Sequence, residues 1–283
     1  MIQLAAGDWR ATLRPELGGA VTALSWRGRD VLRPTPDDAD GPLQTACFPL
    51  VPYANRIDGG RFEFEGRQVH LNPTPGFEPH ALHGDGWRRP WRLEARDDRS
   101  AILVLEHDRG DWPWRWSARQ EVGLDEAGLR ISLSVTNMDD APMPAGLGLH
   151  PCFVRPEDGR LMLEAEAVWR VDERLIPMAL GSPDTVFDWT DGPRIEDAPF
   201  VDNAYAGWNG IARIADEARM VTLEASANVG WAHVYAPRGA GFVCVEPVTH
   251  RPDALNARTG EASGLIVLQP GETAAMSLMI TAA

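Results

Sequence analysis

The 27 glycines and 23 prolines of this 283-residue chain are scattered along its whole length. Proline removes a backbone donor inside a helix and glycine loses much conformational freedom on folding, so long helices do not tolerate this spacing. No stretch of ten or more residues shows the i, i+3, i+4 apolar periodicity of a helix. At most a short helical turn is expected, within residues 39–50. The chain is therefore expected to consist of short strands joined by turns.

Alternating apolar residues between the turns predict where the strands lie. The segment LRISLSVT (129–136) is apolar at every second position, and the turn sequence DEAG joins it to residues 116–123 as a hairpin. Further strands are predicted at residues 101–107, 161–171, 220–225, 230–235, 241–245, 264–268 and 274–280. Many short strands without helices predict an all-β sandwich or barrel. Since no linker or internal repeat divides the sequence, one domain spanning residues 1–283 is expected.

Charge and hydropathy argue against two classes of partner. The formal net charge of −14 repels the phosphates of nucleic acid, so nucleic acid is not expected as a partner. No apolar run approaches the roughly 18 residues that span a bilayer. The first residues also lack the basic and apolar regions of a secretory signal. We therefore expect a soluble, cytoplasmic protein without a membrane partner, either a monomer or a homodimer.

The cysteines and tryptophans add two expectations. Cys47, Cys152 and Cys244 have apolar neighbours and form no CxxC pair, so buried free thiols in a reducing compartment are expected. The chain has 11 tryptophans. Most are expected in the core, but an indole ring also offers an apolar wall on which the C–H face of a sugar can stack.

Two segments carry polar side chains suited to a ligand's hydroxyl groups. In PYANRIDGG, Arg56 follows Asn55 and precedes a glycine turn, and its forked guanidinium can bind a ligand in a bidentate way. In FVDNAYAGW, Asp202 lies among apolar and aromatic residues, where it can accept hydrogen bonds from hydroxyls. Taken alone, these segments equally fit a surface arginine of a hairpin and an aspartate that caps a turn.

Two further segments place histidines beside glycine or proline. In HALHGDGW, His80 and His83 are followed by glycines, which indicates a loop where the backbone approaches another group closely. A metal site needs three or more ligands, so the HxxH pair alone predicts no metal. In AGLGLHPCF, His150 follows an apolar run and precedes Pro151. A general acid and a hydrogen-bonded core histidine both fit this position.

The segment FVCVEPVTHRPDALN joins an apolar strand to a carboxylate. Its first four residues predict a buried strand that ends at Glu246, and Pro247 follows immediately. Either the strand has reached the surface, or the carboxylate lies at the mouth of a pocket. In a pocket, burial would raise the pKa of Glu246 toward the working pH, as a general base requires. Asp253 and Asn256 can hold the following loop by local hydrogen bonds.

Together these segments resemble the aldose 1-epimerase (galactose mutarotase) family. The resembling pieces are YANRIDGGRFEFEG, HALHG, GLGLHPCF, FVDNAYAGW, CVEPVTHRPDALN and GLIVLQPGE. They follow the family's order from residue 53 to about residue 272, so the resemblance covers nearly the whole chain. No single piece is decisive, but the ordered set with the expected residue types is a specific signal.

The resemblance implies a large antiparallel β-sandwich of the galactose mutarotase type, with a sugar-binding cleft on one sheet. It implies interconversion of the α and β anomers of a free aldohexose such as galactose or glucose, without a metal or organic cofactor. By position, Glu246 corresponds to the catalytic base, His150 to the catalytic acid and His83 to a further active-site histidine. The positions that correspond to substrate-binding residues are Arg56, Asn55 and Asp202.

Other functions remain open from the sequence. The family's better-known galactose mutarotases differ at Pro151-Cys152-Phe153 and at Asp85, beside the proposed histidines, which leaves the sugar itself open. A hexose-phosphate mutarotase would use the arginines of GWRRPWR, since guanidinium suits phosphate. A non-catalytic carbohydrate-binding protein would use the same apolar walls and hydroxyl contacts. A glycosidase would require two carboxylates across the bond, for which Asp202 and Glu246 are the candidates.

Overall fold

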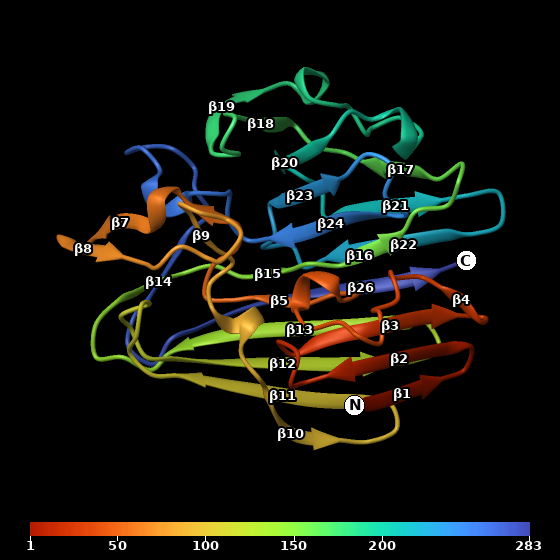
Figure 1. Cartoon of the computed structure of the whole chain (residues 1–283), viewed down its shortest axis with the longest axis horizontal. Helices are drawn as coiled ribbons and strands as arrows, with labels where there is room; N and C mark the ends of the chain where they lie inside the picture. Colours follow the sequence, from red (N-terminus) through yellow and green to blue (C-terminus); the bar gives the residue numbers. More distant parts are fainter.

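The computed structural model describes all 283 residues, which form strands, turns and short 3₁₀ helices without an α-helix (Figure 1). The prediction of an all-β chain is confirmed, and the helical turn expected within residues 39–50 is η1 (Pro42–Gln44). The other 3₁₀ helices are η2 (Asp58–Gly60), η3 (Gly86–Arg88), η4 (Pro183–Thr185), η5 (Ile195–Asp197) and η6 (Ala254–Asn256). None of these helices has the length or apolar character that crossing a membrane requires.

Eight strands form the first large antiparallel sheet. In spatial order they are β10 (Arg92–Arg96), β11 (Ser100–His107), β12 (Trp116–Leu124), β13 (Gly128–Asn137), β26 (Thr273–Ala282), β22 (Met220–Ala225), β21 (Ile211–Ala215) and β17 (Arg160–Leu163). The predicted hairpin is β12 and β13, whose register pairs Leu124 with Leu129. The alternating face of β13 is fully buried, as the period-two pattern indicates.

The second large sheet carries the candidate site. Its order is β19 (Pro177–Gly181), β18 (Ala167–Val171), β20 (Val201–Ala206), β23 (Trp231–Ala236), β24 (Phe242–Val248), β15 (Gly148–Leu149) and β5 (Pro49–Leu50), with β16 (Cys152–Val154) also paired to β24. Figure 1 shows β20, β23 and β24 side by side in this sheet.

Smaller sheets complete the fold. The N-terminal strands β1 (Ile2–Ala6), β2 (Trp9–Arg14), β3 (Ala20–Trp26) and β4 (Arg29–Asp30) form a four-stranded sheet that contacts β12. The remaining pairs are β6 (Arg56–Ile57) with β9 (Ala81–Leu82), β7 (Arg61–Phe64) with β8 (Arg67–His70), and β14 (Met143–Ala145) with β25 (Ile266–Leu268).

One hydrophobic core of 62 buried residues joins the sheets. It takes Leu103, Ile131 and Leu278 from the first large sheet, and Val234 and Val245 from the second. Burying each such side chain stabilises the fold by about 1.5–3 kcal/mol. Because both sheets turn one face to this core, the opposite face of the second sheet is free to form a ligand site.

Three strand predictions need correction. Residues 161–171 form two strands, β17 and β18, which belong to different sheets. The sequence hides this break, because apolar residues continue at every second position from Leu161 to Val171. β25 begins at Ile266 rather than at residue 264. The strand predicted to end before Glu246 continues as β24 through Pro247 to Val248.

Candidate active site

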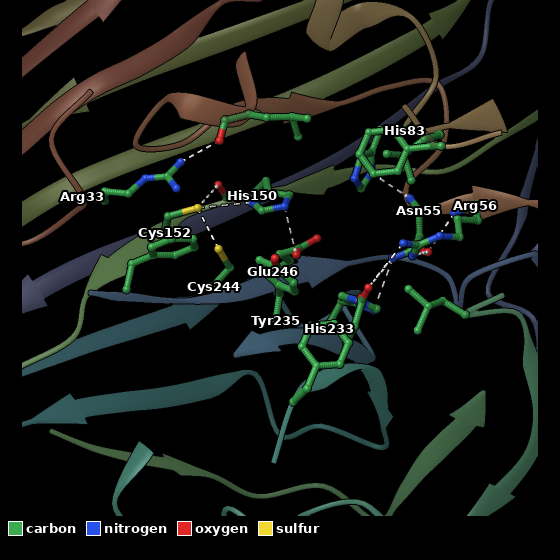
Figure 2. A pocket seen from close by; sticks show the side chains of 17 residues that line it. Arg33, Asn55, Arg56, His83, His150, Cys152, His233, Tyr235, Cys244 and Glu246 are labelled. Atoms are coloured by element: carbon green, nitrogen blue, oxygen red, sulfur yellow. Dashed lines mark hydrogen bonds and ion pairs between the residues drawn. The ribbon is translucent and has the colours of Figure 1, made fainter. Parts of the chain in front are cut away.

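A cavity of about 380 Å³, here called the main cavity, opens on the face of β20, β23 and β24 that points away from the core (Figure 2). Its volume falls within the roughly 300–1,000 Å³ of small-molecule sites. The six site residues predicted from the sequence all line it: Glu246, His150, His83, Arg56, Asn55 and Asp202. The fold thus brings together side chains from five separate segments of the chain, while their individual roles remain predictions.

Strand alternation along β24 places Glu246 in this cavity. Val243 and Val245 pack into the core, whereas Phe242, Cys244 and Glu246 point into the cavity. The carboxylate therefore lies inside a strand, on its cavity face. The sequence did not show this arrangement, because residues 242–245 are apolar on both faces of the strand.

The Glu246 carboxylate contacts the His150 imidazole directly. Glu246 Oε1 lies 3.1 Å from His150 Nε2, and the glutamate side chain is 3% exposed. Burial raises the pKa of Glu246, although the nearby charges of His150 and His233 act in the opposite direction. A buried carboxylate with an elevated pKa and an imidazole partner is the kind of group that enzymes use as a general base.

His150 is fixed by its backbone and by an aromatic neighbour. It follows β15, its N–H donates to the Phe48 carbonyl over 3.0 Å, and its ring stacks on Phe48 with centroids 4.5 Å apart. Burial is the largest single effect and would lower the pKa of His150, but the Glu246 charge and the contacts with Cys152 together outweigh it and raise the pKa to about 9. Near neutral pH the pair therefore consists of an imidazolium and a carboxylate, an acid and a base side by side.

Two thiols flank His150 on its other side. Cys152 and Cys244 are directly opposite each other on β16 and β24, with their sulfurs 2.7 Å apart, and Cys152 Sγ lies 3.6 Å from His150 Nδ1. Imidazole and thiolate are zinc ligands, but two sulfurs bound to one tetrahedral zinc at about 2.3 Å would lie more than 3.5 Å apart. The two sulfurs lie closer than two ligands of one zinc would, so the pair does not have the geometry of a zinc site.

His83 presents its other ring nitrogen to the cavity. Its Nδ1 accepts the backbone N–H of Asn55 over 2.9 Å, and burial lowers its pKa well below the ordinary value. The neutral ring must then carry its proton on Nε2, which makes Nε2 a donor. Gly84 follows at φ +68°, and a Cβ there would lie 2.2 Å from the Val51 carbonyl oxygen. This confirms the prediction that the backbone after His83 approaches another group closely. His80 does not line the main cavity.

A chain of polar contacts crosses the cavity floor. Asn55 Oδ1 accepts the Arg56 backbone N–H over 2.8 Å, and Arg56 Nη2 donates to Asp202 Oδ2 over 3.3 Å. Asp202 Oδ1 contacts His233 Nε2 at 2.6 Å. Burial would raise the pKa of Asp202, but His233 and Arg56 outweigh it and lower the pKa. Asp202 is thus held ionised inside β20, and the reading of this residue as a turn cap is wrong.

The loop after β24 holds the Asn55 segment in place. His250 Nε2 accepts the Ala54 N–H over 2.9 Å, and Asp253 Oδ1 accepts the Asp58 N–H over 3.0 Å. Asp253 also accepts the Asn256 amide over 2.7 Å, which confirms the local hydrogen bonds expected in this loop. A Cβ on Gly146 would lie 1.9 Å from the His250 ring, so the first glycine of AGLGLHP leaves the space that this ring occupies.

Sequence reasoning missed part of the cavity wall. His233 and Tyr235 line it from β23, where they alternate with the core residue Val234. A histidine and a tyrosine at alternate positions of an apolar strand were the available signal. The expectation that most tryptophans lie in the core is confirmed, and none of them lines the main cavity as an indole wall for a sugar. The aromatic lining residues are Phe77, Phe200, Tyr235 and Phe242.

The arginines of GWRRPWR lie elsewhere. Arg88 and Arg89 line a second cavity of about 370 Å³, together with Asp85 and His107. Arg92 is exposed in β10. Because none of the three lines the main cavity, they do not provide the phosphate contacts considered from the sequence.

Comparisons with known proteins agree with this geometry. The sequence model of the family described as aldose 1-epimerase matches residues 1–281. The chain is 32% identical to the uncharacterized protein YphB of Escherichia coli K12, over 93% of each chain. It is 29% identical to the aldose 1-epimerase of the same organism over 59% of this chain and 55% of the relative.

Solved structures share the fold. An Escherichia coli K12 protein, whose assignment as an aldose 1-epimerase is provisional, superimposes with a TM-score of 0.91 at 29% identity, covering 99% of this chain and 98% of the other. A galactose mutarotase-like protein from Clostridium acetobutylicum gives a TM-score of 0.88 at 20% identity, covering 99% and 94%. The predicted galactose mutarotase-like β-sandwich is therefore confirmed.

Proposed function

Because the chain belongs to the aldose 1-epimerase family, we propose that it interconverts the α and β anomers of an aldohexose, with Glu246 as base and His150 as acid. One observation carries the assignment: the two groups touch each other at 3.1 Å while both face the main cavity. In a pyranose, the anomeric hydroxyl oxygen and the ring oxygen are bonded to the same carbon. An acid and a base so close together suit two such neighbouring oxygens.

The reaction needs one proton removed and another delivered. Glu246 takes the proton from the C1 hydroxyl while His150 donates one to the ring oxygen, and the bond between C1 and the ring oxygen breaks. The open aldehyde rotates about C1–C2. The ring then closes on the other carbonyl face, with His150 taking the proton back and Glu246 returning its own. Protons and charge balance over the cycle, so no redox cofactor is required.

The remaining polar groups suit positioning of the sugar. His83 Nε2 is a neutral donor, and the Arg56 and Asp202 pair offers a donor and an acceptor to adjacent hydroxyls. Positioned acid and base groups typically contribute ~10²–10⁴-fold each. Since spontaneous mutarotation is not very slow, two such groups supply most of the acceleration that the reaction needs.

The alternatives differ in what the site must contain. A glycosidase needs two carboxyl groups across the bond, one of them protonated, but Glu246 lies against the His150 imidazolium at 3.1 Å and Asp202 is held ionised by His233 and Arg56. A carbohydrate-binding protein has no use for an acid and base in contact at the floor of its site. A phosphorylated hexose remains a candidate substrate and depends on an arginine other than those of GWRRPWR.

Anomer exchange measured by magnetization-transfer NMR tests the proposal, because it needs no pure anomer. Glucose and galactose are followed with and without the protein at neutral pH, and the spontaneous rate is subtracted. We expect exchange to accelerate in proportion to protein concentration. Sugar binding detected by calorimetry without faster exchange would favour the carbohydrate-binding alternative.

A further inference from the structure

Arg33 places a cation at the end of the main cavity distant from Arg56. It lines the cavity together with Phe242, and its guanidinium lies 4.3 Å from the centre of the Phe242 ring. Its Nη2 donates to the carbonyls of Leu43 and Thr45 over 2.8 and 2.7 Å. Figure 2 shows Arg33 beside Cys152, on the opposite side of the Glu246–His150 pair from Arg56. The guanidinium is therefore held in one place, and its charge has a defined position.

Arg33 is the arginine of the main cavity that has no carboxylate partner. Arg56 is paired with Asp202 at 3.3 Å, and His150 is paired with Glu246 at 3.1 Å. No carboxylate lies within 4.0 Å of Arg33, whose partners are two neutral carbonyls and an aromatic ring. Its Nη1 makes no hydrogen bond to the protein, whereas Nε is enclosed by the protein and out of reach of a ligand. A guanidinium nitrogen left free in this way suits an anion from outside the chain.

Strand spacing shows where Arg33 lies relative to Glu246. Phe242 and Glu246 both face the cavity from β24, four residues apart, which is about 13 Å along a strand. Arg33 stacks on Phe242, and its backbone N–H donates to Cys152, which pairs with Cys244 midway between them. A hexose with its anomeric carbon at Glu246 can place the hydroxyls of C2 and C3 toward Arg56 and Asp202, while C6, attached to C5 beyond the ring oxygen, extends to the other side of the pair, toward Arg33.

We infer that Arg33 binds an anionic group on the end of the sugar remote from the anomeric carbon. This inference rests on the proposed mutarotase function and specifies its substrate class, an aldose that carries a carboxylate or a phosphate. Both anions present oxygens that accept charge-assisted hydrogen bonds from a guanidinium, so the shared chemistry is an oxyanion. Arg33 is then a specificity-determining residue, and it takes no part in proton transfer.

The protein's overall charge does not oppose this assignment. The net charge of −14 repels anions at long range, but salt screens charges beyond about 8–10 Å at physiological ionic strength. Within the cavity both carboxylates already have cationic partners. The local field that an entering oxyanion meets is therefore that of Arg33.

The experiment compares neutral and acidic aldoses in the anomer-exchange assay. Glucose, galactose, glucuronate, galacturonate and glucose 6-phosphate are tested with the unmodified protein, Arg33→Gln and Arg33→Lys. We expect kcat/KM to be higher for at least one acidic aldose than for its neutral parent, and its identity separates carboxylate from phosphate. Arg33→Gln should lower kcat/KM for that acidic aldose by roughly 10–100-fold more than for glucose, mainly through KM, because a charge-assisted hydrogen bond is lost. Arg33→Lys should restore part of the preference.

Two controls separate the possible failures. Arg88→Gln removes an arginine of the second cavity and should keep the substrate preference of the unmodified protein. Calorimetric binding of glucuronate and glucose 6-phosphate tests Arg33 even without catalysis, and binding that Arg33→Gln abolishes would support the anion site alone. Exchange of glucose as fast as that of every acidic aldose would overturn the inference and leave the mutarotase function standing. An equal loss of kcat/KM for all sugars in Arg33→Gln would mean that Arg33 only ties down the Leu43–Thr45 segment.

Discussion

The chain contains two imidazole–carboxylate pairs of the same length in two different cavities. His150 and Glu246 approach to 3.1 Å in the main cavity, and His107 and Asp85 approach to 3.1 Å in the second cavity. In both pairs burial is the largest single effect and would lower the histidine pKa, but the carboxylate partner together with further contacts raises it. Distance and histidine pKa therefore do not distinguish a proton-transfer pair from a structural one.

The carboxylates and their surroundings do distinguish the two pairs. Burial raises the pKa of Glu246, whereas in Asp85 the contacts with His107 and Arg89 outweigh burial and lower the pKa. The Arg89 guanidinium contacts both members of the second pair, and His107 Nε2 contacts the Trp112 carbonyl at 3.1 Å. Asp85 is thus a poor proton acceptor and His107 has both nitrogens engaged. The comparison predicts that the first pair controls activity and the second controls local stability.

The largest expected effect comes from removing each carboxylate's charge. Glu246→Gln should lower kcat by about 10³-fold or more, because the general base is lost while the side-chain shape is kept. Asp85→Asn should leave kcat within a few-fold and lower the melting temperature, because a charge-assisted contact worth about 1.5–3 kcal/mol is weakened. Anomer exchange and thermal unfolding are measured on both variants. Activity of Glu246→Gln at the unmodified rate would show that another group is the base.

A somewhat smaller contrast is expected for the histidines. His150→Gln should reduce kcat by roughly 10²-fold, because a positioned general acid typically contributes at the lower end of its range when water can replace it. His107→Gln should again affect the melting temperature more than the rate. Both variants are assayed beside His83→Gln. If His83→Gln loses more kcat than His150→Gln, the acid role belongs to His83.

The sequence predicts the site better than it predicts the strands that carry it. Glu246, His150, Asp202 and Arg56 stand out because each is a polar residue in an apolar or glycine-rich segment. Arg33 does not meet this criterion, and His233, although polar within an apolar strand, gives no local sign of its partner. His233 pairs with Asp202 only through the register of β23 and β20, and Arg33 reaches the cavity only because Cys152 accepts its backbone N–H. Such neighbours depend on strand pairing across more than 30 residues, which local patterns do not reveal.

The pH dependence of activity tests the protonation states of Glu246 and His150. The active form has Glu246 deprotonated and His150 protonated. The rate should therefore fall on the acid side as Glu246 takes up a proton, at a pH above the ordinary glutamate range because its pKa is raised. It should fall on the alkaline side near about 9, where His150 loses its proton. A kcat profile corrected for spontaneous exchange measures both limbs, and an alkaline limb near the ordinary histidine pKa would contradict the close ion pair.

The smallest expected effect concerns the thiol beside His150. The charge of Cys152 and its contact with the imidazole add to the raised pKa of His150, after the larger contribution of Glu246. Cys152→Ser replaces the thiol with a group that does not ionise in this range, so the alkaline limb should move to lower pH while kcat at neutral pH changes only a few-fold. Cys47→Ser is the matched control, because Cys47 is also buried but does not line the main cavity. An equal shift in both variants would indicate a general loosening of the fold, whereas a shift confined to Cys152→Ser would show that Glu246 and Cys152 act on the same imidazole from opposite sides.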